Sequence, residues 1–178
     1  TLVALLQTGI SPGRVISGPM AEVVMNSTQH LSNTDLTAIA HYLTRLPPGA
    51  PHPKVPATPR LSPPPTQTTL AGGTLYDKHC AQCHGAQGEG VTGAYPPLRG
   101  TVAIHQERTT NLIQAVLHGG FSPATQGNPR PYGMPPYELV FNDRDVASVL
   151  TYVRQSWGNT GAPVSELEVY QARGRFTR

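Results

Sequence analysis

The sequence has few charged residues and no long apolar run. Asp, Glu, Lys and Arg together make up 13% of the 178 residues, and the formal net charge is +3. The basic residues form no continuous run and do not alternate with aromatic residues, so nothing here indicates a nucleic-acid-binding surface. No stretch of 18 or more apolar residues occurs, which predicts that the chain has no transmembrane helix. With 18 glycines and 19 prolines, much of the chain is expected to be loop, turn or linker.

Cysteine is also scarce. The only two are Cys80 and Cys83, too few for a disulfide framework. They belong to the run Cys80-Ala81-Gln82-Cys83-His84, a C-x-x-C-H sequence typical of covalent attachment of a c-type haem. Two thiols on one helical turn can each form a thioether to a haem vinyl group, and the adjacent His84 can then bind the iron. The run therefore predicts one haem c, with His84 as an iron ligand.

Two other kinds of site use a C-x-x-C pair. A zinc ribbon needs a second cysteine pair, which this sequence lacks. A redox dithiol usually lies in a context of alternating strands and helices, and no such pattern surrounds Cys80. Haem attachment is thus the favoured interpretation of the motif.

The residues around the motif predict how it is held. Residues 70–79 are expected to form a helix leading into it, and the pair Gly72-Gly73 would allow another helix to pack closely. A glycine-rich loop follows His84. In this loop, a carbonyl near Pro96 or Pro97 is expected to accept the proton on the second nitrogen of the imidazole, which would fix the ring and tune the iron.

An electron-transfer haem of the low-spin type needs a second axial ligand, normally Met or His. Met134 is the candidate, because the glycine and prolines that flank it make a buried helical position implausible. Tyr132, two residues earlier, and Pro97 are expected to contact the cofactor. The sequence therefore predicts His84 and Met134 as the two iron ligands.

Three histidines are rivals for the sixth position. His118 follows an apolar run and precedes two glycines, so it is expected at a helix C-terminus. His105 is expected in an exposed loop. His79 adjoins the attachment site and cannot reach the opposite haem face.

A further helix is predicted over residues 143–157, with Asn142 or Asp143 as its cap. Trp157 at its end is expected to serve packing rather than electron relay. Packing of this helix across residues 70–79 would complete a small haem-binding domain. Its expected apolar stripe consists of Val146, Val149, Leu150 and Val153.

The chain contains an internal repeat with a shift of 110 residues. Residues 2–9 align with residues 112–119, and six positions from Leu31 to Leu43 align with positions from Phe141 to Val153. Between these blocks each copy has a methionine that we expect in a loop, Met20 in the first and Met134 in the second. No C-x-x-C-H motif precedes Met20, so it is a candidate ligand only if a second haem domain is completed by further sequence.

These observations predict an all-α protein of the class I cytochrome c type. Residues 1–46 are interpreted as the C-terminal half of one haem domain, and residues 69–160 as a complete one. Residues 47–68 form a proline-rich linker, expected to be extended and semi-rigid. Residues 161–178 are expected to be a tail. The first half-domain has too little core to be stable on its own. Either it is part of a longer protein, which we expect because Thr1 starts abruptly inside a helix-like pattern, or this copy has lost its haem.

The sequence resembles the multihaem cytochrome c subunits of bacterial membrane-bound alcohol, gluconate and fructose dehydrogenases. The resemblance lies in Gly18-Pro19-Met20-Ala21-Glu22-Val23-Val24, in residues 27–28 and 31–47, and, in the second copy, in residues 80–85, 95–98, 134–136 and 152–159. The first of these blocks is more selective than the haem motif, which all c-type cytochromes share. This chain departs from the family pattern in having one C-x-x-C-H motif where three are typical.

The resemblance implies a protein that is not an enzyme itself but an electron-transfer subunit at the periplasmic face of the inner membrane. It would take electrons from a flavin- or quinone-dependent catalytic subunit and pass them to ubiquinone or another acceptor. A peripheral membrane contact through the C-terminal tail is a weaker expectation. The alternative is an independent, diffusible c-type cytochrome that serves a respiratory oxidase or reductase.

Overall fold

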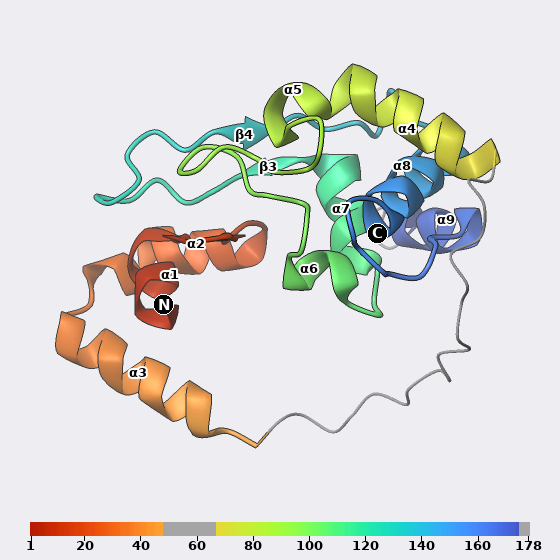
Figure 1. Ribbon diagram of the computed structural model, residues 1–178. Helices are drawn as coiled ribbons and strands as arrows, with labels where there is room; N and C mark the ends of the chain where they lie inside the picture. Colours follow the sequence, from red (N-terminus) through yellow and green to blue (C-terminus); the bar gives the residue numbers. More distant parts are fainter. Residues whose placement is uncertain (48–66, 175–178) are drawn as a thin grey trace.

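The computed structural model describes residues 1–47 and 67–174, which form two modules (Figure 1). The N-terminal module contains α1 (Leu2–Thr8), β1 (Ile10–Ser11), β2 (Arg14–Val15), α2 (Pro19–Asn26), the 3-10 turn η1 (Thr28–His30) and α3 (Asn33–Arg45). The C-terminal module contains α4 (Gln67–His79), α5 (Ala81–His84), α6 (Val102–His105), α7 (Thr110–His118), β3 (Gly120–Phe121), β4 (Gly133–Met134), α8 (Asp143–Gln155) and α9 (Glu166–Gly174). The predicted all-α class is confirmed, since the strands of the described residues form only two short antiparallel hairpins, β1–β2 and β3–β4.

In the described parts of the chain, no helix combines the length and apolar character needed to cross a bilayer. The predicted proline-rich linker lies almost entirely outside the described residues.

The core of the C-terminal module is the crossing of α4 and α8, which lie against each other in Figure 1. The helices approach so closely because α4 carries Gly72 at the crossing. A Cβ atom at that position would lie 2.2 Å from the carbonyl oxygen of Ser148 on α8. The close packing predicted from the Gly-Gly pair is therefore confirmed. Tyr76, one turn further along α4, is fully buried against Tyr152 and Trp157.

Helix α8 begins with a capping box. The side chain of Asn142 accepts a hydrogen bond from the backbone N–H of Asp145 at 2.9 Å, and the Asp145 carboxylate accepts one from the backbone N–H of Asn142 at 3.2 Å. Each bond satisfies a donor that has no partner within the helix, which fixes the start of α8. Of the two predicted caps, Asn142 is the N-cap residue of α8.

The 110-residue repeat is confirmed for two helices and one strand. Helix α3 spans the same positions in the first copy as α8 does in the second, and Ser32 caps it as Asn142 caps α8. Helix α1 corresponds to the last seven residues of α7, and β1 corresponds to β3. Both α1 and α7 end at a glycine with positive φ, 78° at Gly9 and 61° at Gly119. The two copies thus share their helix, hairpin and helix order.

The prediction that Met20 lies in a loop like that of Met134 is wrong. Met134 pairs with Gly120 in its hairpin, and the equivalent pair in the first copy is Val15 with Ile10. Met20 lies further along, as the second residue of α2. A helix begins there because Pro19 favours the first helical position and good helix-forming residues follow it, whereas two prolines follow Met134.

Residues 161–174 of the predicted tail belong to the C-terminal module rather than forming a separate tail. Val164, Val169 and Ala172 are buried in the same core as α4 and α8. Arg154 of α8, only 1% exposed, donates hydrogen bonds to the carbonyls of Ala162, Ile104 and Gln106, at 2.6, 2.6 and 3.0 Å. The hydrogen bonds of Arg154 could not be predicted from periodicity, because a buried arginine does not follow the apolar stripe of its helix.

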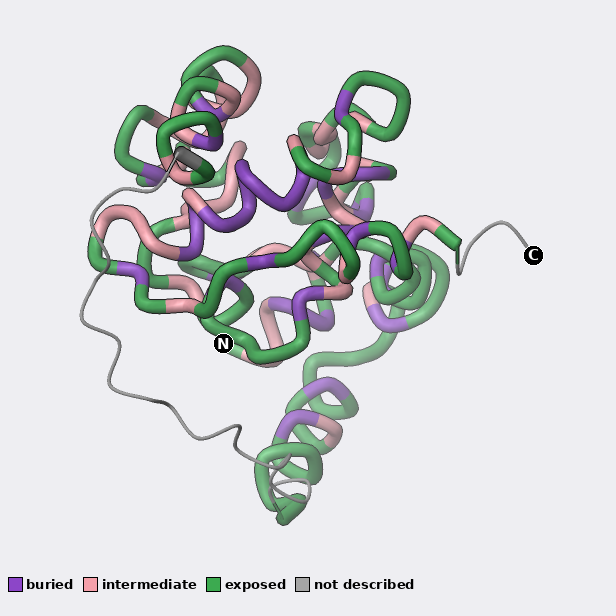
Figure 2. Tube along the Cα trace, turned by 90° about the vertical axis from the view of Figure 1, so that its right-hand side faces the viewer, coloured by how far each residue is buried: buried purple, intermediate pink, exposed green. Residues whose placement is uncertain are grey.

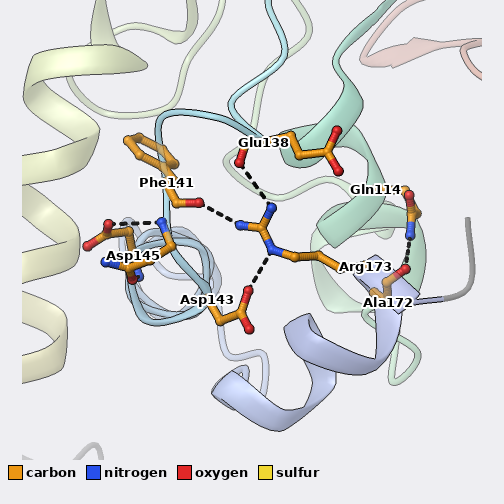
Figure 3. A network of polar contacts seen from close by, with 8 residues as sticks. Gln114, Glu138, Phe141, Asp143, Asp145, Ala172 and Arg173 are labelled. Atoms are coloured by element: carbon orange, nitrogen blue, oxygen red, sulfur yellow. Dashed lines mark hydrogen bonds and ion pairs between the residues drawn. The ribbon is translucent and has the colours of Figure 1, made fainter. Parts of the chain in front are cut away.

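A second arginine ties the end of α9 to the start of α8 (Figure 3). The guanidinium of Arg173 forms an ion pair with Asp143 at 2.6 Å and donates to the backbone carbonyls of Glu138 and Phe141. On the other side of α9, the amide of Gln114 donates to the carbonyl of Ala172 at 3.0 Å. Helix α9 is therefore held to both α7 and α8.

The two modules meet at the loop between β3 and β4, residues 122–132. This loop is longer than its counterpart, since only two residues join β1 to β2. The hydroxyl of Thr125 donates to the carbonyl of Thr8 at 3.1 Å, and Pro123 packs where a Cβ atom on Gly9 would lie. The loop of the second copy thus contacts the end of α1 in the first.

Helix α3 is exposed around most of its surface, as Figure 2 shows for the helix at the bottom of the view. Only Leu36 and Ala40 are buried. Its counterpart α8 is covered by α4 on one side and by α9 on another. The first copy therefore leaves open a helix face that the second copy buries.

Candidate haem site

The C-x-x-C-H motif lies on a single short helix. Cys80 caps α5, and Cys83 and His84 are its last two residues. The backbone N–H groups of both donate to the carbonyl of Cys80, at 3.1 and 2.9 Å, which closes one tight turn. Both cysteines are free thiols and half-buried. The motif thus presents two thiols and an imidazole from one rigid turn that continues α4.

The environment of Cys80 opposes the two alternative uses of the motif. Burial, and to a lesser degree the neighbouring Cys83, raise the pKa of the Cys80 thiol to about 11. Disulfide exchange needs the thiolate, which is scarce at neutral pH with such a pKa. Moreover, the described residues bring together no group of three His, Cys, Asp or Glu side chains that could hold a metal ion.

His84 is oriented by a backbone carbonyl, as the sequence predicts. Its Nδ1 atom lies 3.0 Å from the carbonyl oxygen of Pro96. Since a carbonyl only accepts, Nδ1 carries the proton, and Nε2 keeps a free lone pair for a metal. Burial lowers the pKa of the imidazole, although the Pro96 carbonyl acts against this, so the neutral ring is favoured. Of the two predicted acceptors, Pro96 provides the carbonyl.

Pro97 contributes through the backbone rather than as the acceptor. A residue that precedes proline is restricted to extended conformations, so Pro97 limits the angles that Pro96 can adopt. Gly90 passes directly behind this segment. A Cβ atom on it would lie 2.5 Å from the carbonyl oxygen of Tyr95 and 2.7 Å from the nitrogen of Pro97. The Pro96 carbonyl is therefore held from both sides.

Met134 is fixed by its hairpin and by the end of α7. It pairs with Gly120 across the hairpin, and its carbonyl lies 2.1 Å from where a Cβ atom of Gly119 would be. Just after it, the backbone N–H groups of Tyr137 and Glu138 donate to the carbonyl of Leu117, at 3.1 and 3.0 Å. The thioether is thus carried by an anchored segment, half-buried against the module's core.

Tyr132 lies at the edge of the motif. Its ring is 5.0 Å from that of Tyr95, centroid to centroid. Partial burial raises the pKa of the Tyr95 phenol, and so does a hydrogen bond with the Cys83 thiol. The two tyrosines therefore form an aromatic pair next to the second attachment cysteine.

This donor set fits a covalently bound haem. Two neutral thiols on one turn suit two thioether bonds, the Nε2 atom of His84 suits one axial position, and the Met134 thioether is the kind of ligand found at the other. The sequence profile of the Cytochrome c family matches residues 70–157, the part of the chain that holds all of these residues. In addition, 98 residues align at 33% identity with cytochrome c-552 of Thermus thermophilus, covering 70% of that protein and 50% of this chain. The chain belongs to the cytochrome c family.

Longer relatives align with both modules of this cytochrome c. The cytochrome c subunit of the quinone alcohol dehydrogenase from Gluconacetobacter polyoxogenes is 33% identical over 184 residues, which is 92% of this chain and 39% of that subunit. The gluconate 2-dehydrogenase cytochrome c subunit of Pantoea cypripedii is 35% identical over 152 residues, 80% of this chain and 33% of the subunit. The chain thus spans about two fifths or less of these relatives. It is similar to the electron-transfer subunits of dehydrogenases rather than to their catalytic subunits.

Membership of the family implies a covalently bound c-type haem and electron transfer through it. The roles of Cys80, Cys83, His84 and Met134 in holding that haem remain predictions, which their placement favours.

The rival histidines of this cytochrome c lie where other contacts explain them. His118 is the last residue of α7, as predicted, and lies 3.5 Å from the carboxylate of Glu138. His79 ends α4, with its ring edge-on to Tyr137 and Phe141. The prediction of a loop for His105 is wrong. It ends the short helix α6, where its Nδ1 bonds to the carbonyl of Thr101, and it is exposed.

Two tyrosines that the sequence did not single out also brace the motif. The Tyr76 hydroxyl donates to the carbonyl of Gly85, directly after His84, at 2.6 Å. The Tyr137 hydroxyl donates to the carbonyl of His79, directly before Cys80, at 2.8 Å. Tyr76 is buried and Tyr137 is half-buried, and the sequence around each indicates only core packing. Their hydrogen bonds in the structure show that the two hydroxyl groups hold the two ends of the attachment turn.

Proposed function

We propose that this cytochrome c passes single electrons from the catalytic subunit of a dehydrogenase, of flavin- or quinone-cofactor type, towards ubiquinone or another acceptor. The observation that carries the proposal is the attachment turn on α5, with His84 oriented by Pro96 so that its Nε2 is free to bind iron. The names of the relatives, which are cytochrome c subunits of alcohol and gluconate dehydrogenases, support the choice of donor.

In this proposal each residue of the site has one task. Cys80 and Cys83 would attach the haem by thioethers, and His84 and Met134 would bind its iron. When bound, the haem supplies an iron that alternates between the ferrous and ferric states. The Met134 thioether favours the ferrous state and the hydrogen-bonded His84 favours the ferric state, so the protein sets the balance between them. Tyr132 and Pro97 line the site beside these ligands.

We interpret the N-terminal module as the C-terminal half of a second haem domain. Tyr42 on α3 is 66% exposed, whereas its counterpart Tyr152 on α8 packs against Tyr76 of α4. The face that α4 covers in the second copy is thus open in the first. We infer that a helix equivalent to α4, with its own attachment motif, covers α3, and that Met20 is a candidate ligand there.

The proposed location is the periplasm, at the surface of the inner membrane. The support is the kinship with subunits of dehydrogenase complexes and the need for covalent haem loading. A peripheral membrane contact would use Leu167 and Tyr170, which are exposed on α9 while its other apolar residues are buried. Such a contact would be weak, since it offers few apolar side chains.

Replacing Met134 with leucine is expected to abolish the Met-to-iron absorption band near the red end and to lower the reduction potential. Leucine fills a similar volume but offers no sulfur, so the ferrous state loses its favoured ligand. The fall should amount to roughly a few tenths of a volt, within the range of about 0.8 V that axial ligands span. The measurement is a spectroelectrochemical titration beside the intact mass of the denatured protein.

Met25→Leu is the matched control, since Met25 is exposed on α2 and should leave both band and potential unchanged. An unchanged band in Met134→Leu would remove Met134 as a ligand. A denatured mass without covalent haem would refute the whole proposal.

The donor is tested by co-purification. A tagged chain produced with its native partners is expected to retain a dehydrogenase subunit that contains flavin or a quinone cofactor, and that subunit's substrate should reduce the haem. Recovery of the cytochrome alone, with no reduction when alcohol, gluconate or fructose is added to the membrane fraction, would instead favour an independent carrier.

A further inference from the structure

The carbonyl that orients His84 belongs to a loop, residues 85–100, that depends on outside support. Within it, the backbone N–H groups of Leu98 and Arg99 both donate to the carbonyl of Gly88, at 2.8 and 2.9 Å. The N–H of Gly90 donates to the carbonyl of His84 at 2.7 Å. These bonds fold the loop back on the motif. Tyr76 holds its first residue, Gly85, and Leu98 packs partly buried against the core, but none of these contacts is a hydrogen bond to α8.

Asn159 supplies that tie. It lies four residues beyond the end of α8 and is only 5% exposed. Its side-chain amide donates to the carbonyl of Leu98 at 3.2 Å and to that of Val153 at 2.8 Å, and its carbonyl oxygen accepts from the N–H of Gly100 at 2.9 Å. One side chain thus joins the last turn of α8 to the loop, 59 to 61 residues away in sequence.

The backbone that presents Asn159 adopts an uncommon conformation. Trp157 has a φ of 55°, the one positive value among the described residues other than glycine. Its indole covers Gly88, where a Cβ atom would lie 2.6 Å from the ring. Such a conformation is strained for a residue other than glycine and persists only where the surroundings enforce it. The turn after α8 therefore has two contacts with the loop, Trp157 on Gly88 and Asn159 on Leu98 and Gly100.

We propose that Asn159 is a positioning residue for the haem iron, because it holds the loop in the place where the Pro96 carbonyl accepts the proton of His84. An amide suits this place, since it offers two donors and one acceptor to two carbonyls and one N–H. This inference rests on the proposed ligation of iron by His84. A firm bond from Nδ1 raises the basicity of the imidazole, which stabilises ferric iron and lowers the reduction potential.

The test compares two variants of Asn159 with a control in the haem-loaded full chain. Asn159→Asp keeps the oxygen that accepts from Gly100 but loses both donors, and Asn159→Ala loses all three bonds. Thr151→Val is the control, since it removes two buried hydrogen bonds between α8 and Val164, away from the loop. The readouts are the exchange rate of the His84 Nδ1 proton in the ferrous state, by nuclear magnetic resonance, and the reduction potential.

Both Asn159 variants should exchange the Nδ1 proton roughly tenfold faster or more, the effect of losing about one net hydrogen bond. Their potentials should rise while the Met-to-iron band is retained. Thr151→Val should change neither value even if it lowers thermal stability. Unchanged exchange and potential in the Asn159 variants would overturn the inference. A wild-type protein without a His84-bound haem would instead refute the proposed function.

If neither variant folds, native-state hydrogen exchange of the wild-type protein tests whether Asn159 holds His84 in place. The side-chain amide protons of Asn159 and the Nδ1 proton of His84 should then become exchangeable in one opening event, with the same dependence on denaturant. Release of the His84 proton while the Asn159 amide stays protected would overturn the inference.

Discussion

Replacing Arg154 with methionine is expected to lower the free energy of unfolding by about 2–4 kcal/mol. Methionine keeps the apolar stem of the side chain but leaves the buried carbonyl of Ile104 without a donor, at a cost of about 1–3 kcal/mol. It also removes the hydrogen bonds to the part-buried carbonyls of Gln106 and Ala162. These three carbonyls join α6 and the segment before α9 to α8. The measurement is urea denaturation of the haem-loaded protein, followed by circular dichroism.

Arg173→Met is the matched control for this prediction. Arg173 also donates to two backbone carbonyls and pairs with a carboxylate, but its side chain is 23% exposed. Water can replace its bonds, so the expected loss is about 1 kcal/mol or less. Equal losses of stability for both variants would show that the cost of removing the arginine does not depend on its burial.

Replacing Gly72 with alanine is expected to destabilise the C-terminal module by about 1–2 kcal/mol, although alanine is the better helix former. The added Cβ atom would lie 2.2 Å from the carbonyl oxygen of Ser148, so α4 and α8 must separate. Overpacking of this kind costs about 1–3 kcal/mol, which outweighs the gain of about 1 kcal/mol in helix propensity. The midpoint and slope of urea denaturation measure the change.

Gly73→Ala provides the comparison within the same helix. Its Cβ atom would lie 3.2 Å from the ring of Tyr152, a side chain that can rotate slightly. The expected change is within about 1 kcal/mol of the wild type. A stabilised Gly72→Ala variant would mean that the two helices are not pressed together as described.

The attachment turn could be predicted from sequence because its parts are adjacent in the chain. Cys80, Cys83 and His84 lie within five residues, and their spacing alone defines the chemistry. The non-helical position of Met134 was also within reach, because two prolines follow it, whereas the proline before Met20 begins a helix. The close crossing of α4 and α8 was indicated by the pair Gly72-Gly73, because small residues in a helix have few other uses.

The parts that sequence reasoning missed depend on partners far away in the chain. Arg154 belongs to an otherwise apolar face, and it stabilises the module by donating hydrogen bonds to three carbonyls of two other segments. Helix α9 has few apolar residues, so its place in the core could not be read from periodicity. Asn159 resembles any polar residue after a helix until Leu98 and Gly100 are seen beside it. A side chain whose role is to satisfy distant backbone groups leaves no local pattern.

The contact between Thr8 and Thr125 spans 117 residues, and this has a consequence for the order of folding. During synthesis or export from the N-terminus, α1 emerges long before the loop of residues 122–132 that it contacts. Over that interval the first copy has α1, α2 and α3 but lacks the surface on which α1 ends. Gly9 at the end of α1, on which Pro123 later packs, is then open to other chains. The N-terminal module is thus made before the C-terminal module but completed only with it, and a chaperone that covers the end of α1 in the interval would protect it.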